Sequence, residues 1–311
     1  MSVYDNNFIR YPKNHHMKNT VSRRLFLQRS FAAGIGLAAM KHFSEIPVGI
    51  KKGMQFGLVT YLWAQDWDLP AIIANCEKTG FRGVELRTQH AHKVEINLNA
   101  SQRAEVKKRF ANSSVTCIGY GSNFEYHSPD PAILHQNIEQ TKEYIKLCRD
   151  IGATGIKVKP NDLPAGIPKE KTIAQIAASL NEVGKFARDY DQLVRVEVHG
   201  NLTQEIPNMK AIFDQVTESN VKICWNCNDQ DLLPPGLEEN FNMLKKWFGD
   251  TVHIRELNEG NYPYQQLFNL FSGIGYNGWI LLEARTEPTD KIAAMKEQLS
   301  IFNKMISQTK K

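Results

Sequence analysis

Residues 193–200, LVRVEVHG, alternate between apolar and polar side chains. Successive side chains of a strand point to opposite faces, so the three valines share one face and Arg195, Glu197 and His199 share the other. Charged groups inside a fold are costly unless they pair, bind a metal ion or line a wet cavity. The polar face therefore predicts either a lattice of internal ion pairs or a functional site.

Four other apolar runs carry polar side chains in the same way. They are GVELR, GIKVK, VHIRE and LLEAR, whose polar faces hold Glu85 and Arg87, Lys157 and Lys159, His253 and Arg255, and Glu283 and Arg285. Strands of a parallel sheet that is covered on both sides normally form continuous apolar runs. Polar groups repeated near the ends of five strands favour a site that several strands share.

Eight extended apolar runs alternate with helical patterns from residue 52 onward. The runs are 56–63, 83–87, 115–119, 154–159, 193–199, 221–227, 251–256 and 279–283. Eight strand–helix units in about 250 residues predict a single α/β domain, a (β/α)8 TIM barrel over residues 52–308. A doubly wound open sheet is the alternative, but no G-x-G-x-x-G motif follows the first run.

The first 40 residues differ from the rest of the chain in charge. They hold six basic side chains and one acid, a net charge of +5, which is also the net charge of the whole protein. The remaining chain is therefore neutral and offers no basic surface for nucleic acid. Arg23 and Arg24 precede a short apolar run at 31–40, a pattern that resembles a twin-arginine export signal. We expect residues 1–45 to direct export to the periplasm, with a disordered basic tail as the alternative and no membrane span elsewhere.

Three of the polar strand residues fall where a known family places its metal ligands. With Glu197 on the fifth predicted strand, His253 on the seventh and Glu283 on the eighth, residues 52–308 resemble a family of sugar isomerases and epimerases. This family has a xylose isomerase-like TIM barrel and includes the ketose 3-epimerases. The resemblance implies that the three residues bind a divalent metal ion. The fourth ligand of the family, an aspartate on the sixth strand, corresponds to Asn226.

The sixth predicted strand lies in ICWNCND, residues 223–229, whose two cysteines could also belong to a redox motif. Cys224 and Cys227 are three residues apart, so on a strand they point to opposite faces and do not meet the geometry of a disulfide. The odd total of five cysteines also argues against a disulfide framework. We predict buried thiols, with Asn226 on the inner face and Asp229 in place of a histidine that follows in the family.

The ligand set implied by the resemblance contains one amide. It consists of Glu197, Asn226, His253 and Glu283. Oxygen ligands with one imidazole favour Mn, Mg or Co over a structural zinc ion. An amide contributes no charge, so two carboxylates stand where the family pattern supplies three. This leaves open a weaker site, a more Lewis-acidic metal, no metal, or a substitute ligand from Asn228 or Asp229.

Further polar residues are expected at the carboxyl ends of the strands, where TIM-barrel sites are built. We predict substrate contacts from Glu85, His90, His127, Lys159, His199, Asp229 and Arg255. A histidine in a loop is more often exposed to solvent without a binding role, and this is the alternative for His90 and His127. His92 is a further candidate for a substrate contact, with the same alternative.

The predicted constellation favours proton abstraction next to the carbonyl of a keto sugar. Glu197 would remove the proton, Glu283 would return one from the opposite side, and the metal ion would stabilise the developing negative charge. This chemistry predicts an isomerase or epimerase for a small carbohydrate substrate. A lyase that eliminates across 3-keto-glycosides, which export would favour, and a sugar-binding protein without catalysis are the alternatives. A homo-oligomer remains open.

Replacing Arg23 and Arg24 together by lysine should leave the protein in the cytoplasm, because the arginine pair is the recognised feature of such a signal. Cell fractionation with immunoblotting measures this, and Arg10→Lys, which lies outside the pair, is the control. Periplasmic recovery of the double variant at the wild-type level would contradict the assignment.

Overall fold

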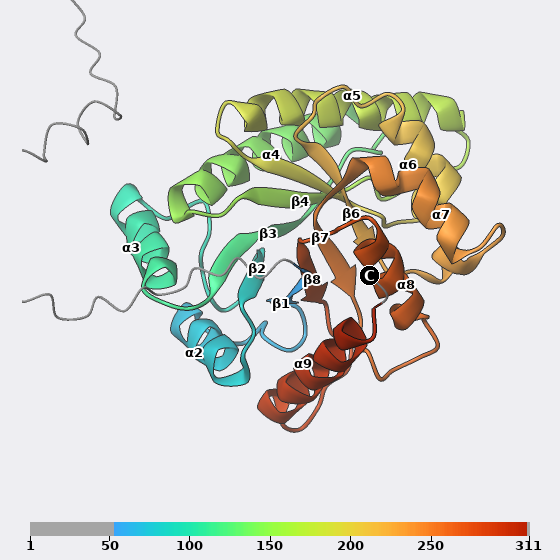
Figure 1. Ribbon diagram of the computed structural model, residues 1–311. Helices are drawn as coiled ribbons and strands as arrows, with labels where there is room; N and C mark the ends of the chain where they lie inside the picture. The colour runs from blue at the N-terminus through green and yellow to red at the C-terminus, as the bar shows by residue number, and fades with distance from the viewer. Residues whose placement is uncertain (1–52, 310–311) are drawn as a thin grey trace, which may run out of the picture. The chain divides into compact units, whose positions relative to one another are not determined.

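The protein is described here by a computed structural model of residues 53–309, with a closed barrel of eight parallel strands at its centre (Figure 1). The strands are β1 (Gln55–Val59), β2 (Gly83–Arg87), β3 (Thr116–Glu125), β4 (Gly155–Lys159), β5 (Leu193–Glu197), β6 (Val221–Asn226), β7 (Phe248–Ile254) and β8 (Trp279–Leu282). Each strand pairs with the next along the chain, and β8 closes on β1, with Leu282 beside Leu58. The predicted (β/α)8 TIM barrel is confirmed. The predicted export signal lies outside the described residues.

Helices alternate with the strands and form the outer layer (Figure 1). They are α2 (Leu69–Thr79), α3 (Ala100–Ala111), α4 (Pro131–Ile151), α5 (Lys169–Arg188), α6 (Ile206–Phe213), α7 (Leu237–Leu244), α8 (Tyr264–Gly273) and α9 (Lys291–Ser307), with short 3-10 helices η1 (Asp229–Leu232) and η2 (Lys245–Trp247). Asp68, Asp130 and Asp290 cap the first turns of α2, α4 and α9 by accepting backbone N–H groups. Over residues 53–309, none of the helices has the length and apolar character that a bilayer crossing requires.

The apolar faces of the strands form one core with the surrounding helices. Val194, Val196 and Val198 are fully buried and belong to the same apolar cluster as Ile176 and Leu180 of α5. This is the arrangement that the alternating pattern of residues 193–200 predicts. The helices therefore cover the valine face of β5, and the polar face of this strand is turned into the barrel.

The carboxyl ends of β1 and β3 differ most from the predicted runs. β1 ends at Val59, although the apolar run continues to Trp63, because Trp63 is buried in the following loop, where its Nε1 donates to Thr286 O at 2.9 Å. β3 continues to Glu125, which is in register with Lys159 of β4. Its second half, GSNFE, lacks the apolar alternation by which a strand is recognised in sequence.

An ion pair between a fully buried guanidinium group and a partly exposed carboxylate lies near the start of β7. Arg195 Nε and Nη2 donate to Asp250 Oδ1 and Oδ2 at 2.7 and 2.8 Å, and Nη2 also donates to Thr154 Oγ1 at 2.7 Å. Gly119 and Gly155 leave the space for the guanidinium group, since Cβ atoms there would lie 2.5 and 2.8 Å from Arg195 Nη1. Arg195 thus forms an internal ion pair, which was the alternative to a role in a functional site.

Gly119→Ala should destabilise the protein by about 1–3 kcal/mol, because the new methyl group would collide with the Gly155 carbonyl and with Arg195. Gly273→Ala at the end of α8 is the matched control, because a Cβ there has no heavy atom within 4 Å. We expect its effect to stay within about 1 kcal/mol. Urea unfolding measures both, and equal free energies of unfolding for the two variants would contradict this view of the barrel interior.

Candidate functional site

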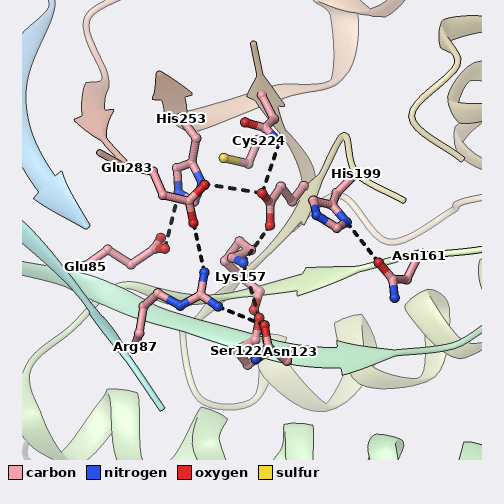
Figure 2. A network of polar contacts seen from close by, with 12 residues as sticks. Glu85, Arg87, Ser122, Asn123, Lys157, Asn161, His199, Cys224, His253 and Glu283 are labelled. Carbon is pink, nitrogen blue, oxygen red and sulfur yellow. Dashed lines mark hydrogen bonds and ion pairs between the residues drawn. The ribbon is translucent and has the colours of Figure 1, made fainter. Parts of the chain in front are cut away.

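The ends of β5, β7 and β8 bring Glu197, His253 and Glu283 together. Figure 2 shows His253 and Glu283 side by side. One ligand atom of each lies within 4.8 Å of the others. His253 Nδ1 is 3.7 Å from Glu197 Oε1 and 4.0 Å from Glu283 Oε2. All three side chains are buried, so the residues predicted on three separate strands form one compact group, called here the triad.

Each carboxylate of the triad is held by a cation through its other oxygen. Lys157 Nζ donates to Glu197 Oε2 at 2.6 Å, and Arg87 Nη1 donates to Glu283 Oε1 at 2.8 Å. Glu197 Oε1 and Glu283 Oε2 are thereby left facing His253. Burial alone would raise the pKa of Glu197, but Lys157 and His253 outweigh it and hold this pKa well below its usual range.

Glu85 lies at the opposite edge of the imidazole of His253. Its Oε1 is 3.2 Å from His253 Nε2, and both side chains are fully buried. Gly121 leaves room for the carboxylate, since a Cβ there would lie 2.6 Å from Glu85 Oε1. Burial by itself lowers the pKa of His253, but Cys224 and Glu85 outweigh it and raise this pKa. Glu85 therefore faces His253 as a fully buried carboxylate, and its predicted contact with a substrate stays a prediction.

Asn226 lies beside the triad on the inner face of β6. Its Nδ2 donates to Glu197 Oε1 at 3.2 Å and to Asn228 Oδ1 at 3.4 Å. Asn228 is itself held by the carbonyl of Val198, to which its Nδ2 donates at 2.7 Å.

All five cysteines are free and buried, so the predicted buried thiols are confirmed.

Lys159 and His199 lie at the rim of the triad. Both are partly buried, and burial lowers the pKa of each. For Lys159 the neighbouring charge of Lys157 acts in the same direction. For His199, Glu197 acts in the opposite direction. The structure thus places these two predicted substrate contacts where they share the electrostatic environment of the carboxylates.

The other predicted contacts lie in the segments that follow β2, β3 and β6. His90 is partly buried near Arg87, and burial, followed by the charges of His92 and Arg87, lowers its pKa to about 4. His127 Nδ1 is 3.2 Å from Glu125 Oε2 in the loop after β3. Asp229 is exposed at the start of η1.

Arg255 follows β7 and acts electrostatically on a second buried carboxylate, that of Asp231. It opposes the effect of burial on Asp231, whose pKa burial raises to about 7. Tyr262 Oη donates to Asp231 Oδ2 at 2.7 Å, so this carboxylate is tied to the loop after β7. Asp231 therefore joins η1 to the loop after β7, and the predicted substrate contact of Arg255 stays a prediction.

Sequence reasoning missed the roles of Lys157, Arg87 and His92. Alternation placed both cations on inner faces, but their partners depend on which strand ends meet. His92, considered as a substrate contact, is buried in the loop after β2, where both ring nitrogens are used. Nδ1 accepts the N–H of Val94 at 3.0 Å, so Nε2 donates to Arg87 O at 2.8 Å.

The donor atoms of the triad fit a divalent cation. Two carboxylate oxygens and one imidazole nitrogen converge, and neither ring nitrogen of the fully buried His253 has a hydrogen-bond partner. A carboxylate behind a histidine, as Glu85 is here, is the usual way in which a metal-binding imidazole is oriented. Asn226 would join such a site by turning its amide so that Oδ1 replaces Nδ2.

A family model described as Xylose isomerase-like TIM barrel matches residues 73–230, and the chain belongs to this family. Its fold is similar to that of an L-ribulose 3-epimerase, with 18% identity, a TM-score of 0.71 and coverage of 82% of this chain and 95% of the other. A 3-keto-D-glucoside 4-epimerase from E. coli is 14% identical, with a TM-score of 0.68 and coverages of 81% and 99%. A D-psicose 3-epimerase from Clostridium cellulolyticum H10 is 17% identical, with a TM-score of 0.67 and the same coverages.

Asn226→Asp should lower stability without metal and bind a divalent ion more tightly. The new carboxylate would face Glu197 Oε1, which is now 3.2 Å from the amide nitrogen. A cation between them reverses this repulsion, and we expect about tenfold tighter Mn²⁺ binding, roughly 1.4 kcal/mol. Thermal melting and calorimetric titration of metal-stripped protein measure the two effects. Asn303→Asp, which adds the same charge at an exposed position of α9, is the control. Equal Mn²⁺ affinities of both variants would exclude Asn226 from the metal site.

Proposed function

We propose that this protein is an enzyme, a sugar isomerase or epimerase that moves a proton at a carbon beside the carbonyl of a keto sugar. The observation that carries the proposal is the geometry of Glu197 and Glu283, which flank His253 Nδ1 at 3.7 and 4.0 Å. Two carboxylates on different strands can reach opposite sides of one carbon, as epimerisation requires. Family membership and the similarity in fold to sugar epimerases support the same reaction class.

The two cations each occupy one oxygen of a triad carboxylate. Lys157 and Arg87 hold Glu197 Oε2 and Glu283 Oε1, so the two carboxylates are fixed beside His253, with Glu197 placed to take up the proton and Glu283 to return one. The low pKa of Glu197 makes it a weak base, so the substrate carbon must be acidified. A divalent ion, Mn, Mg or Co, held by the triad with Asn226, would do this by polarising the carbonyl oxygen of the sugar.

The surroundings of the triad suit a polyhydroxy substrate. Lys159 supplies hydrogen-bond donors, and His199 is a polar group at the same rim. We assign the proposed reaction to the periplasm on the basis of the twin-arginine pattern at Arg23 and Arg24. If a leaving group were attached to the carbon next to the deprotonated one, the same proton removal would produce elimination. This is why 3-keto-glycosides are tested together with ketoses.

Incubation of the Mn²⁺-loaded protein with ketoses and 3-keto-glycosides in heavy water should introduce deuterium at a carbon beside the carbonyl. Proton NMR measures the exchange and separates an epimer from an elimination product. Glu197→Gln and Glu283→Gln should each slow the exchange by about 100-fold or more, because each removes one proton-transfer group. Glu259→Gln, at an exposed position after β7, is the control. Binding without exchange, epimer or eliminated product would contradict the proposed enzyme and favour a sugar-binding protein.

A further inference from the structure

A chain of polar contacts leads from the rim of the triad across three successive strand ends. His199, after β5, has its Nδ1 at 2.8 Å from Asn161 Oδ1. Asn161, after β4, donates from Nδ2 to Oε2 of Glu125, the last residue of β3, at 2.6 Å. Figure 2 shows His199 with Asn161 on one side and Lys157, His253 and Glu283 on the other. The imidazole therefore lies between this chain and the triad.

The hydrogen bonds of the chain have a fixed direction because its far end is a carboxylate. An ionised carboxylate only accepts, so Asn161 must turn its NH2 group to Glu125 and its Oδ1 to His199. Since Oδ1 is an acceptor, His199 Nδ1 must carry the hydrogen. A neutral imidazole has one N–H group, so Nε2 of His199 is left with a free lone pair.

The backbone holds Asn161 in place for this contact. Asn161 has a φ of +75°, a left-handed conformation that asparagine tolerates better than most residues. It forms an isolated bridge with Gly200, where any Cβ would collide with the Asn161 backbone. The ends of β4 and β5 are thus kept together beyond their last strand residues, and the side chain of Asn161 is set beside His199.

We propose that Glu125 and Asn161 are positioning residues that present His199 Nε2 to the substrate as a hydrogen-bond acceptor for one sugar hydroxyl group. This inference rests on the proposed function, because it takes the substrate to be a polyhydroxy compound. Lys159 at the same rim can only donate, so the two residues together select a group that both donates and accepts. A hydroxyl group meets this requirement, whereas a carbonyl or ether oxygen cannot donate to His199.

One substitution should remove the fixed direction of these hydrogen bonds, and a second should restore it. Glu125→Gln keeps the shape but allows the amide of Asn161 to flip, so His199 can adopt either tautomer. Adding Asn161→Asp restores the direction, because an aspartate accepts both from Gln at position 125 and from His199 Nδ1. With the substrate found by deuterium exchange, at pH 8, kcat/KM should fall about three- to tenfold in Glu125→Gln and recover to within about twofold in the double variant. Glu259→Gln is again the control.

The tautomer itself can be measured without any substrate. Long-range proton–nitrogen NMR on protein labelled with ¹⁵N-histidine distinguishes Nδ1–H from Nε2–H, and the His199 signal is identified by its loss in His199→Gln. We expect Nδ1–H in the wild type and in the double variant, and a mixture in Glu125→Gln. An Nε2–H tautomer in the wild type, or no recovery of kcat/KM in the double variant, would overturn the inference. Lack of turnover of every sugar by a protein with the Nδ1–H tautomer would instead overturn the proposed function.

Discussion

A charged side chain that is buried inside a barrel must pair with an opposite charge, and this constraint determines how the site is arranged. Lys157 and Glu197 form a fully buried pair with Nζ and Oε2 2.6 Å apart, which joins β4 to β5. Arg87 and Glu283 join β2 to β8 in the same way. Removal of one member of such a pair typically costs about 3–5 kcal/mol, because the remaining charge stays buried without a partner. The groups proposed for chemistry are therefore also part of what holds the strand ends together.

The ion pairs explain how the carboxylates can serve both purposes. Each uses one oxygen for a cation and leaves the other facing His253, so stability and reactivity depend on different atoms of the same group. Asn226 fits this balance, since a neutral amide beside Glu197 adds no further negative charge to the metal-free site. The asparagine that departs from the family pattern is thus consistent with a site whose carboxylates already have cationic partners.

The rim of the site depends on contacts that lie just beyond the sheet. β3 is longer than its apolar pattern, and this extension places Glu125 in reach of Asn161. The bridge between Asn161 and Gly200 then brings the next two strand ends together. Loops that are tied to each other by short polar contacts can orient a side chain such as His199 more closely than free loops can, because fewer rotamers remain open to it.

The sequence by itself determined the eight strand–helix units, the inner position of Glu197, Asn226, His253 and Glu283, and the burial of the cysteines. The inner positions follow from a period of two residues, which is a local property of each strand. The burial of the cysteines, two of which lie on α2 and α4, follows from the general tendency of free cysteines to be buried. Only the tertiary structure decided that Lys157 meets Glu197, that Glu85 faces His253 and that Arg195 pairs with Asp250. Alternation tells which face a side chain occupies, but its depth along the barrel and its partner on another strand depend on closure and stagger of the strands. His92 and Asn161 likewise acquired their roles from loop contacts that no periodic pattern encodes.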